Sequence, residues 1–170
     1  MKCLLFLLLS FFHVQAYTQT SSQLNAKRIT LPNGWQISPA GNSIPLGDLP
    51  LNLAVSKSGK LMAVTNNGQS TQTLQLINIK TNRTISQTEI AKSWYGLKFS
   101  NDENSLYASA GNDDQVKKYT ITNGNLILAD SFLLREKTKV LISPSGIEID
   151  EATGKLYVCL LYTSPSPRDS

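Results

Sequence analysis

Short runs of alternating apolar and polar residues fill most of the chain between residues 47 and 158. An alternation with a period of two places successive side chains on opposite faces of a strand. Polar turns rich in Asn, Gly, Ser and Lys separate the runs. No stretch keeps helical spacing over three turns. The pattern therefore predicts an all-β chain of short antiparallel strands.

The predicted strands form two successive groups of four, and a third group begins after them. The first group is predicted at residues 52–56, 61–65, 73–79 and 84–90. The second group is predicted at residues 96–100, 105–109, 115–121 and 126–134. The third group has predicted strands at residues 145–150 and 156–158. In the third strand of the first group, Leu74, Leu76 or Ile77, and Ile79 are available to a core.

A motif led by leucine marks the second strand of each group. Leu-Met-Ala-Val-Thr-Asn-Asn at residues 61–67 recurs as Leu-Tyr-Ala-Ser-Ala-Gly-Asn at residues 106–112, and Leu-Tyr-Val starts at Leu156. The leading leucines lie 45 and 50 residues apart. Four short strands in such a period are typical of a β-propeller blade, and a β-sandwich with regular turns is the alternative. We expect a partial β-propeller with about two complete four-stranded blades plus fragments.

These motifs carry a resemblance to known repeats. Leu-Tyr-Val at 156–158, Val-Thr-Asn at 64–66 and the preceding residues 55–61 resemble YVTN-type β-propeller repeats. The resemblance covers about residues 47–158 and departs from the family pattern at Lys57, Ser58 and the turn at 101–104.

The stretches 31–41 and 47–52 resemble the start of exported bacterial propellers. In those proteins a phosphoesterase of the alkaline-phosphatase superfamily often follows the propeller. The resemblance thus implies a module that works beside such an enzyme.

The first 16 residues have the features of a secretory signal peptide. Lys2 precedes an apolar run at 4–12, and Val14 and Ala16 are small residues placed for cleavage after Ala16. The run is shorter than the ~20 residues that span a bilayer, although an uncleaved anchor is the alternative. We expect a periplasmic or secreted protein with no membrane contact beyond this peptide.

Residues 159–170 interrupt the third repeat after Val158. The segment resembles the in-frame translation of a transposase-type sequencing adapter, and a Ser/Pro-rich tail is the alternative. Resequencing the locus distinguishes the two, because a native stop codon after Ser170 would rule out the adapter.

The expected organisation follows from these assignments. It comprises a signal peptide (1–16), an N-terminal segment with strands for a closing blade (17–46), two blades (47–90 and 91–138), a truncated blade (139–158) and the adapter-derived segment (159–170).

Composition narrows the chemistry further. The formal net charge is +4, but the charges are scattered and form no basic stripe with interleaved aromatics, so we expect no nucleic-acid binding. The only histidine is His13, and the two cysteines are Cys3 and Cys159. Residues 17–158 therefore contain no disulfide, Cys/His zinc site, cysteine nucleophile or Ser-His-Asp triad. No catalytic residue is assigned, and whether the full-length protein is an enzyme stays open.

Propeller topology groups the loops that follow the second and fourth strands at one face, around the channel. The candidate ligand-binding residues there are Asn66, Asn67, Trp94, Tyr95, Asn112, Asp113 and Asp114. The Asn and Asp oxygens suit Ca²⁺ or Mg²⁺, although no metal site is assigned. Trp94 and Tyr95 suit stacking on a sugar or an aromatic ligand. Turn geometry and packing between blades are the alternative roles.

Three functions remain open at this point. The first is an exported propeller module with a binding or scaffold role, which takes a small-molecule or protein ligand at the channel face. The second is a propeller hydrolase of the lactonase type. The third is a surface protein that uses its repeats for adhesion or protein recognition.

Overall fold

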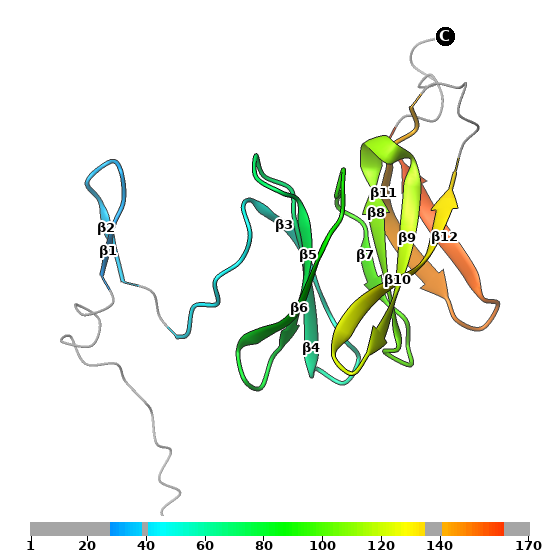
Figure 1. Ribbon diagram of the computed structural model, residues 1–170. Helices are drawn as coiled ribbons and strands as arrows, with labels where there is room; N and C mark the ends of the chain where they lie inside the picture. The colour runs from blue at the N-terminus through cyan, green and yellow to red at the C-terminus, as the bar shows by residue number, and fades with distance from the viewer. Residues whose placement is uncertain (1–27, 39–40, 135–140, 162–170) are drawn as a thin grey trace, which may run out of the picture. The chain divides into compact units, whose positions relative to one another are not determined.

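A computed structural model describes residues 28–38, 41–134 and 141–161 (Figure 1). The chain divides into two units, Met1–Ser43 and Ile44–Ser170, and each is described by itself. The predicted signal peptide and residues 162–170 lie outside the described residues. No helix among the described residues is long and apolar enough to cross a membrane.

The first unit contains a β-hairpin formed by β1 (Ile29–Thr30) and β2 (Gln36–Ile37). The Asn-Gly pair at 33–34 explains the turn, because Gly34 adopts a positive φ of 80° and its N–H donates to the Leu31 carbonyl. The Asn33 side chain accepts from the Trp35 N–H at 3.0 Å. Both strands lie within the segment 17–46, whose role in a closing blade stays a prediction.

The second unit is built from three antiparallel sheets in chain order (Figure 1). The first sheet contains β3 (Pro50–Val55), β4 (Leu61–Asn66), β5 (Thr73–Asn78) and β6 (Arg83–Glu89). The second contains β7 (Leu97–Phe99), β8 (Ser105–Ala110), β9 (Gln115–Thr122) and β10 (Asn125–Leu133). The third contains β11 (Pro144–Asp150) and β12 (Lys155–Leu160). A short 3₁₀ helix, η1 (Gly111–Asp113), follows β8. The all-β fold class is confirmed.

The true register of the repeat differs by one residue from the sequence alignment. Val55 pairs with Met62, Phe99 with Leu106, and Ile149 with Leu156. Met62, and not Leu61, is therefore the structural equivalent of Leu106. A slip of one residue moves every side chain of a strand to the opposite face, so the predicted equivalence of Leu61 and Leu106 is wrong.

The turns explain this register. Ser56 N–H donates to the Leu61 carbonyl, and Ser100 N–H donates to the Ser105 carbonyl, each at 2.9 Å. These bonds make Leu61 and Ser105 equivalent, as the first residues of β4 and β8, so the residue equivalent to Leu106 is Met62.

The core lies between the first and second sheets. Ala63, Leu74 and Leu76 from the first sheet are fully buried in one cluster with residues of the second. The second sheet contributes Leu97, Phe99, Leu106, Ala108, Tyr119 and Leu126. Burial raises the pKa of Tyr119 to about 12. The two blades therefore share a core and do not have one each.

Strand β5 buries two consecutive apolar residues, which simple alternation does not allow. Leu76 and Ile77 are both fully buried. The pairing of β5 with β6 shifts register between them, opposite Ser86 and Thr84, so a bulge lies on β6. Leu76 faces the shared core, and Ile77 lies on the opposite face of the sheet because it pairs with Met62. The sequence could not decide between these two residues, and the structure buries both.

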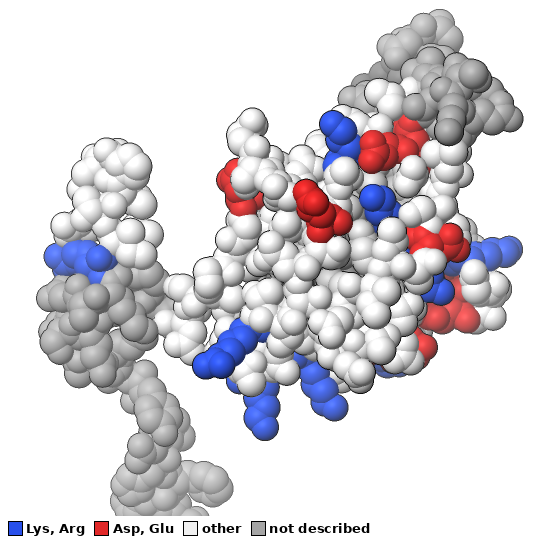
Figure 2. Space-filling view, viewed as in Figure 1, with Lys and Arg blue, Asp and Glu red and all other residues white. Residues whose placement is uncertain are grey.

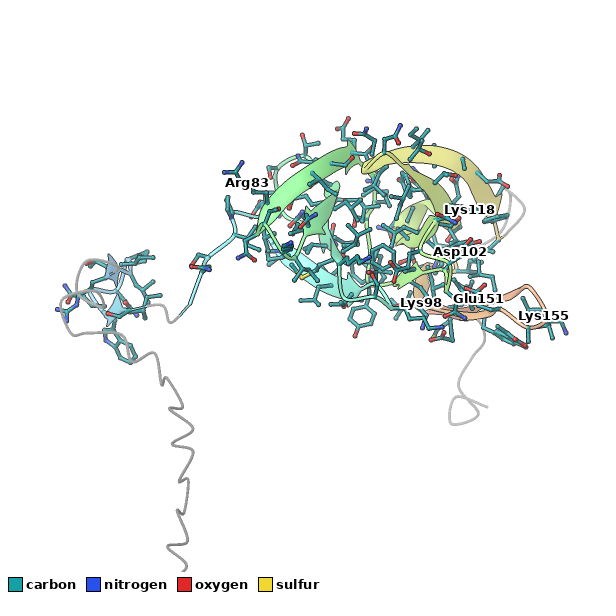
Figure 3. The ribbon with its side chains drawn as sticks, turned by 90° about the horizontal axis from the view of Figure 1, so that it is seen from below. Arg83, Lys98, Asp102, Lys118, Glu151 and Lys155 are labelled. Carbon is teal, nitrogen blue, oxygen red and sulfur yellow. The ribbon has the colours of Figure 1, made fainter. Side chains whose placement is uncertain are left out.

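Glutamates join the sheets at their turn end. Glu103 in the β7–β8 turn accepts from the Ser58 N–H, and from the Ser58 hydroxyl at 2.8 Å. Glu151 after β11 accepts from the Asn101 N–H at 2.7 Å. In each case a carboxylate of one sheet caps the turn of the sheet before it. Seen from below, Lys98, Asp102 and Glu151 group where the second and third sheets meet, and Arg83 lies on the first sheet (Figure 3).

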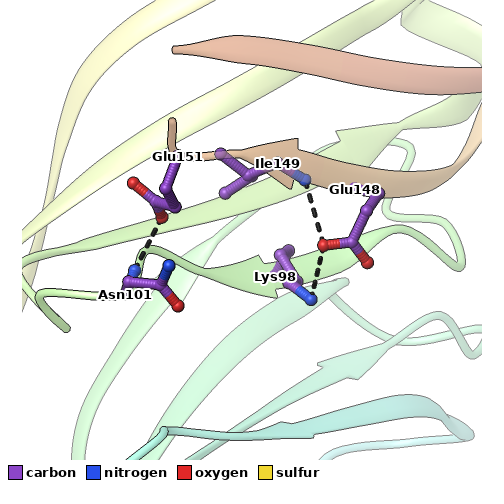
Figure 4. A network of polar contacts seen from close by, with 5 residues as sticks. All are labelled: Lys98, Asn101, Glu148, Ile149 and Glu151. Carbon is purple, nitrogen blue, oxygen red and sulfur yellow. Dashed lines mark hydrogen bonds and ion pairs between the residues drawn. The ribbon is translucent and has the colours of Figure 1, made fainter. Parts of the chain in front are cut away.

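An ion pair reinforces the contact between the second and third sheets (Figure 4). The Lys98 ammonium lies 2.7 Å from a carboxylate oxygen of Glu148, which also accepts from the Ile149 N–H. The bond from Lys98 holds the pKa of Glu148 below its usual range. Both partners are substantially exposed, so the pair adds little to stability.

Acidification will test the Glu103 contact. The N–H of Ser58, and then its hydroxyl, lower the pKa of Glu103 below its usual value of 4.5. Because the folded-state pKa is the lower one, the stabilisation is present above the unfolded pKa and is lost as the pH falls through the folded pKa. We expect Glu103→Gln to lower the urea midpoint of unfolding at pH 7. Between pH 5 and pH 3 the midpoint of this variant should decrease less than that of the unchanged protein.

The matched control for this test is Glu89→Gln, at the end of β6 and away from these turns. Equal loss of pH dependence in both variants would contradict the contact.

Truncation of the shared core will test the packing between sheets. We expect Leu76→Ala to reduce the free energy of unfolding by about 2–5 kcal/mol, because it removes buried methyl groups and leaves a cavity. Leu128→Ala, on the exposed part of β10, should change it by less than about 0.5 kcal/mol. Urea denaturation followed by far-UV circular dichroism measures both. Similar effects would show that the sheets do not share a core.

Candidate functional site

The loop end of the second unit lies opposite the turns and brings together segments distant in sequence. Segment 91–96 enters β7, segment 141–143 enters β11, and η1 lies between β8 and β9 at the upper end of the second sheet (Figure 1). In the space-filling view, acidic side chains lie both towards this end of the first two sheets and at the lower right of the unit, and basic ones extend from the lower end of the first sheet (Figure 2). This loop end holds the residues predicted to bind a ligand.

Trp94 is fixed by its backbone and by a glycine beneath its ring. The Trp94 N–H donates to the Ser109 carbonyl at 3.0 Å. A Cβ on Gly111 would lie 3.2 Å from Cβ and Cγ of Trp94, closer than ordinary packing allows. Glycine at position 111 therefore favours the close approach of Trp94 to η1, because a Cβ there would make the Trp94 side chain shift by a few tenths of an ångström. The Trp94 side chain nevertheless stays exposed.

Tyr95 is held from the first sheet. The Asn52 side-chain amide on β3 donates to the Tyr95 carbonyl at 2.6 Å. The Tyr95 side chain itself is about half exposed. The aromatic pair therefore lies at the junction of the first and second sheets, with backbone contacts to both.

Asp114 is buried and bonded to the backbone. It follows η1 in the left-handed conformation, with φ 53°. Its Oδ1 accepts from the N–H groups of Ile142 and Ser143 at 3.0 and 2.9 Å. The Ser143 hydroxyl lies 3.2 Å from Oδ1 of Asn112. Asp114 thus anchors the segment that enters β11, whereas Asp113 makes none of these contacts.

Asn66 belongs to a buried amide network on the first sheet. Its Nδ2 donates to Thr73 Oγ1 at 3.1 Å and to Gln75 Oε1 at 2.9 Å. Gln75 Oε1 also accepts from the Gly47 N–H, and its Nε2 donates to Gln87. Asn66 Oδ1 is buried and has no hydrogen-bond partner among the residues that the structure describes. This side chain is a structural part of the sheet and is not open to a ligand.

Asn67 lies just beyond this network. Its N–H donates to the Leu49 carbonyl at 3.0 Å, so it ties the β4–β5 loop to the segment before β3. The side chain is partly exposed.

Asp48 organises the β4–β5 loop, a role that the sequence did not indicate. Its Oδ2 accepts from the N–H groups of Gln69 and Ser70 at 2.7 and 3.2 Å. A Cβ on Gly68 would lie 2.1 Å from the Asp48 carboxylate, so only glycine fits there. The sequence signal for this role was the combination of Asp48, just before the first strand of a repeat, with the Asn-Gly pair at 67–68, just after the second strand.

The structure divides the predicted site into two groups. Trp94 lies with η1 and the buried Asp114 near the second sheet, whereas Asn66 and Asn67 are tied to the segment before β3. Among the described residues, no three or more His, Cys, Asp or Glu side chains are placed to hold a metal ion. The Asn and Asp residues considered for Ca²⁺ or Mg²⁺ belong to both groups.

The comparisons with known proteins establish the fold. No family model matches the sequence, and no curated protein matches it. The β-propeller domain of Cps50 (Swd1) from Myceliophteria thermophila aligns with a TM-score of 0.53 and 16% identity, over 66% of this chain and 36% of that one. Hydrazine synthase from Kuenenia stuttgartiensis aligns with a TM-score of 0.51 and 17% identity, over 62% and 35%.

These alignments define the class of protein. At such identities the likeness shows the fold alone, and this chain spans little more than a third of the length of either structure. Together with the stacked four-stranded sheets, it shows that the second unit is a β-propeller module with a partial set of blades.

Substitution of Asp114 will test its anchoring role. Asp114→Asn keeps an acceptor and tolerates the left-handed backbone, so it should cost about 1 kcal/mol through weaker, neutral hydrogen bonds. Asp114→Ala leaves the N–H groups of Ile142 and Ser143 without this acceptor and should cost about 2–3 kcal/mol or more. Urea denaturation measures both.

The neighbouring carboxylate provides the control. Asp113→Ala should change the free energy of unfolding by less than about 0.5 kcal/mol. A cost equal to that of Asp114→Ala would show that the two carboxylates act together, against the anchoring role.

Proposed function

We propose that this chain is an exported β-propeller module that binds a ligand at its loop end and contributes no catalytic residue. One observation carries the proposal: the exposed pair Trp94–Tyr95, held in place at the junction of two blades. Exposed aromatic side chains on a fixed backbone lose little conformational freedom on binding, which favours affinity.

The chemistry around the pair favours a ligand with an apolar face and polar edges, such as a sugar or an aromatic glycoside. An indole and a phenol ring each combine an apolar surface with a hydrogen-bonding group. Asn112 is exposed and Asp113 partly exposed on η1, the element over which the Trp94 ring lies. A ring that stacks on Trp94 would therefore have polar groups close to its edge.

Export and the partner enzyme are proposed from the sequence. The signal-peptide features of residues 1–16 support a periplasmic or secreted location. The resemblance of 31–41 and 47–52 to exported propellers, and of the repeats to the YVTN type, supports a scaffold role beside a phosphoesterase. No contact in the structure favours the lactonase or the adhesion alternative over this proposal.

Calorimetric titration with neutral oligosaccharides and aryl glycosides will test the binding site. For any sugar that binds, we expect Trp94→Ala to weaken binding at least about tenfold, which corresponds to about 1.4 kcal/mol of lost stacking. Tyr95→Ala should weaken it by a smaller factor, because its backbone contact with Asn52 remains.

Trp35→Ala is the matched control. Trp35 is the more exposed tryptophan and lies in the hairpin of the first unit, so binding should be unchanged. Binding that is insensitive to Trp94→Ala, or binding to none of these compounds, would contradict the proposed site. Hydrolysis of a phosphate ester or a lactone by this chain would contradict the noncatalytic role.

A further inference from the structure

The chain contains three Asn-Gly pairs, at residues 33–34, 67–68 and 123–124. An asparagine followed by glycine can lose its side-chain amide without an enzyme, because the glycine has no side chain to hinder attack by its own backbone nitrogen. The attack requires that this nitrogen and the asparagine amide are not held by other groups. The hydrogen bonds in the structure therefore distinguish the three pairs.

The pair at 33–34 is held at both reacting groups. The Gly34 N–H donates to the Leu31 carbonyl at 2.9 Å. The Asn33 side-chain oxygen accepts from the Trp35 N–H at 3.0 Å. Both hydrogen bonds must break before the Gly34 nitrogen can reach the Asn33 amide carbon.

The pair at 67–68 is held by the segment before β3. The Gly68 N–H donates to the Asp48 carbonyl at 3.0 Å, and the Asn67 N–H donates to the Leu49 carbonyl at 3.0 Å. A Cβ on Gly68 would lie 2.1 Å from the Asp48 carboxylate, so this negative charge lies beside the glycine. A neighbouring negative charge disfavours loss of the N–H proton, which the attack requires.

The pair at 123–124 has neither restriction. It forms the two-residue loop between β9 and β10, and both residues have positive φ, 51° and 78°, as in a type I′ turn. In such a turn the flanking residues, Thr122 and Asn125, pair with each other. The Asn123 side chain is exposed. Among the described residues, neither its amide nor the Gly124 N–H has a hydrogen-bond partner.

We propose that Asn123 is a site of spontaneous deamidation in the folded protein. The Gly124 nitrogen gives up its proton to water or hydroxide and bonds to Cγ of Asn123, and the Cγ–Nδ2 bond breaks with release of ammonia. The product is a five-membered succinimide. One water molecule then opens the ring, at Cγ to give aspartate or at the backbone carbonyl to give isoaspartate. No oxidant, reductant or cofactor is needed.

The cyclisation requires the turn to open briefly. The turn lies at the end of the second sheet opposite η1, and it closes a hairpin whose second strand, β10, is exposed over most of its length. Segments with few buried contacts open locally at low cost in free energy. The site is therefore separate from the loop end, where we propose that a ligand binds.

The turn also contacts the first sheet. A Cβ on Gly124 would lie 3.5 Å from the Ile85 side chain, and the Leu126 N–H donates to the Ser86 hydroxyl at 3.0 Å. Isoaspartate adds one backbone carbon to a loop of two residues, which displaces Leu126 relative to Ser86. Deamidation at Asn123 would therefore loosen the contact between the two sheets.

Incubation of the folded chain at about pH 8, followed by peptide mapping with mass spectrometry, will test the proposal. We expect Asn123 to deamidate at least about tenfold faster than Asn67, which corresponds to about 1.4 kcal/mol of barrier, and faster than Asn33. In a urea concentration that unfolds the chain the three rates should become similar, because the hydrogen bonds at 34 and 68 are then lost. The variant Asn123→Gly has no amide to lose and keeps a residue suited to positive φ, so it should remove the fast ammonia release.

The effect on the sheet contact has its own control. The aged protein, separated by ion exchange, should have a lower urea midpoint than freshly purified Asn123→Asp, which carries the same charge on an unchanged backbone. Equal midpoints would contradict this effect. Deamidation of Asn33 or Asn67 in the folded chain as fast as that of Asn123 would overturn the proposed site. So would a preference for Asn123 that persists in urea, since it could not come from the fold.

Discussion

The structure of the second unit depends on the burial of one sheet face against the next. Ala63, Leu74 and Leu76 meet Leu106 and Tyr119 in a single core, and each fully buried Leu contributes about 1.5–3 kcal/mol relative to exposure. Neither four-stranded sheet encloses a core of its own. The separation of the sheets then sets the other contacts, since Glu103 can reach Ser58, and Asn52 can reach Tyr95, only when the sheets are stacked.

This dependence explains what the sequence could predict. Alternation and turn residues were sufficient for the strands, because both signals are local. The pairing register of the strands, in contrast, depends on contacts between residues that are not neighbours in the sequence. Leu61 and Met62 are both apolar, so from the sequence alone either could be aligned with Leu106. The turn hydrogen bonds of Ser56 and Ser100, and the sheet face that meets the neighbouring sheet, show which of the two is equivalent. The bulge on β6 opposite Leu76 and Ile77 could not be predicted for the same reason. It accompanies the burial of one apolar residue on each face of β5.

The candidate site shows a similar limit. Topology correctly placed the loops after the second and fourth strands at one end, but residue type did not reveal how each side chain is used. The amide of Asn66 and the carboxylate of Asp114 are bound by neighbouring chain segments, because buried polar groups require partners. Trp94 stays exposed although it approaches Gly111 closely. Such roles depend on contacts between segments that are far apart in the sequence.

Asn52 connects the first sheet to the aromatic pair. Its backbone pairs with Thr65 between β3 and β4. Its side chain donates to the Tyr95 carbonyl at 2.6 Å, and the Trp94 N–H donates to the Ser109 carbonyl of the second sheet. Packing of the first sheet on the second therefore restricts the backbone of the aromatic pair from both sides. Because a site that is ordered before binding loses less entropy on binding, the same core that holds the two sheets together would favour ligand binding at the loop end.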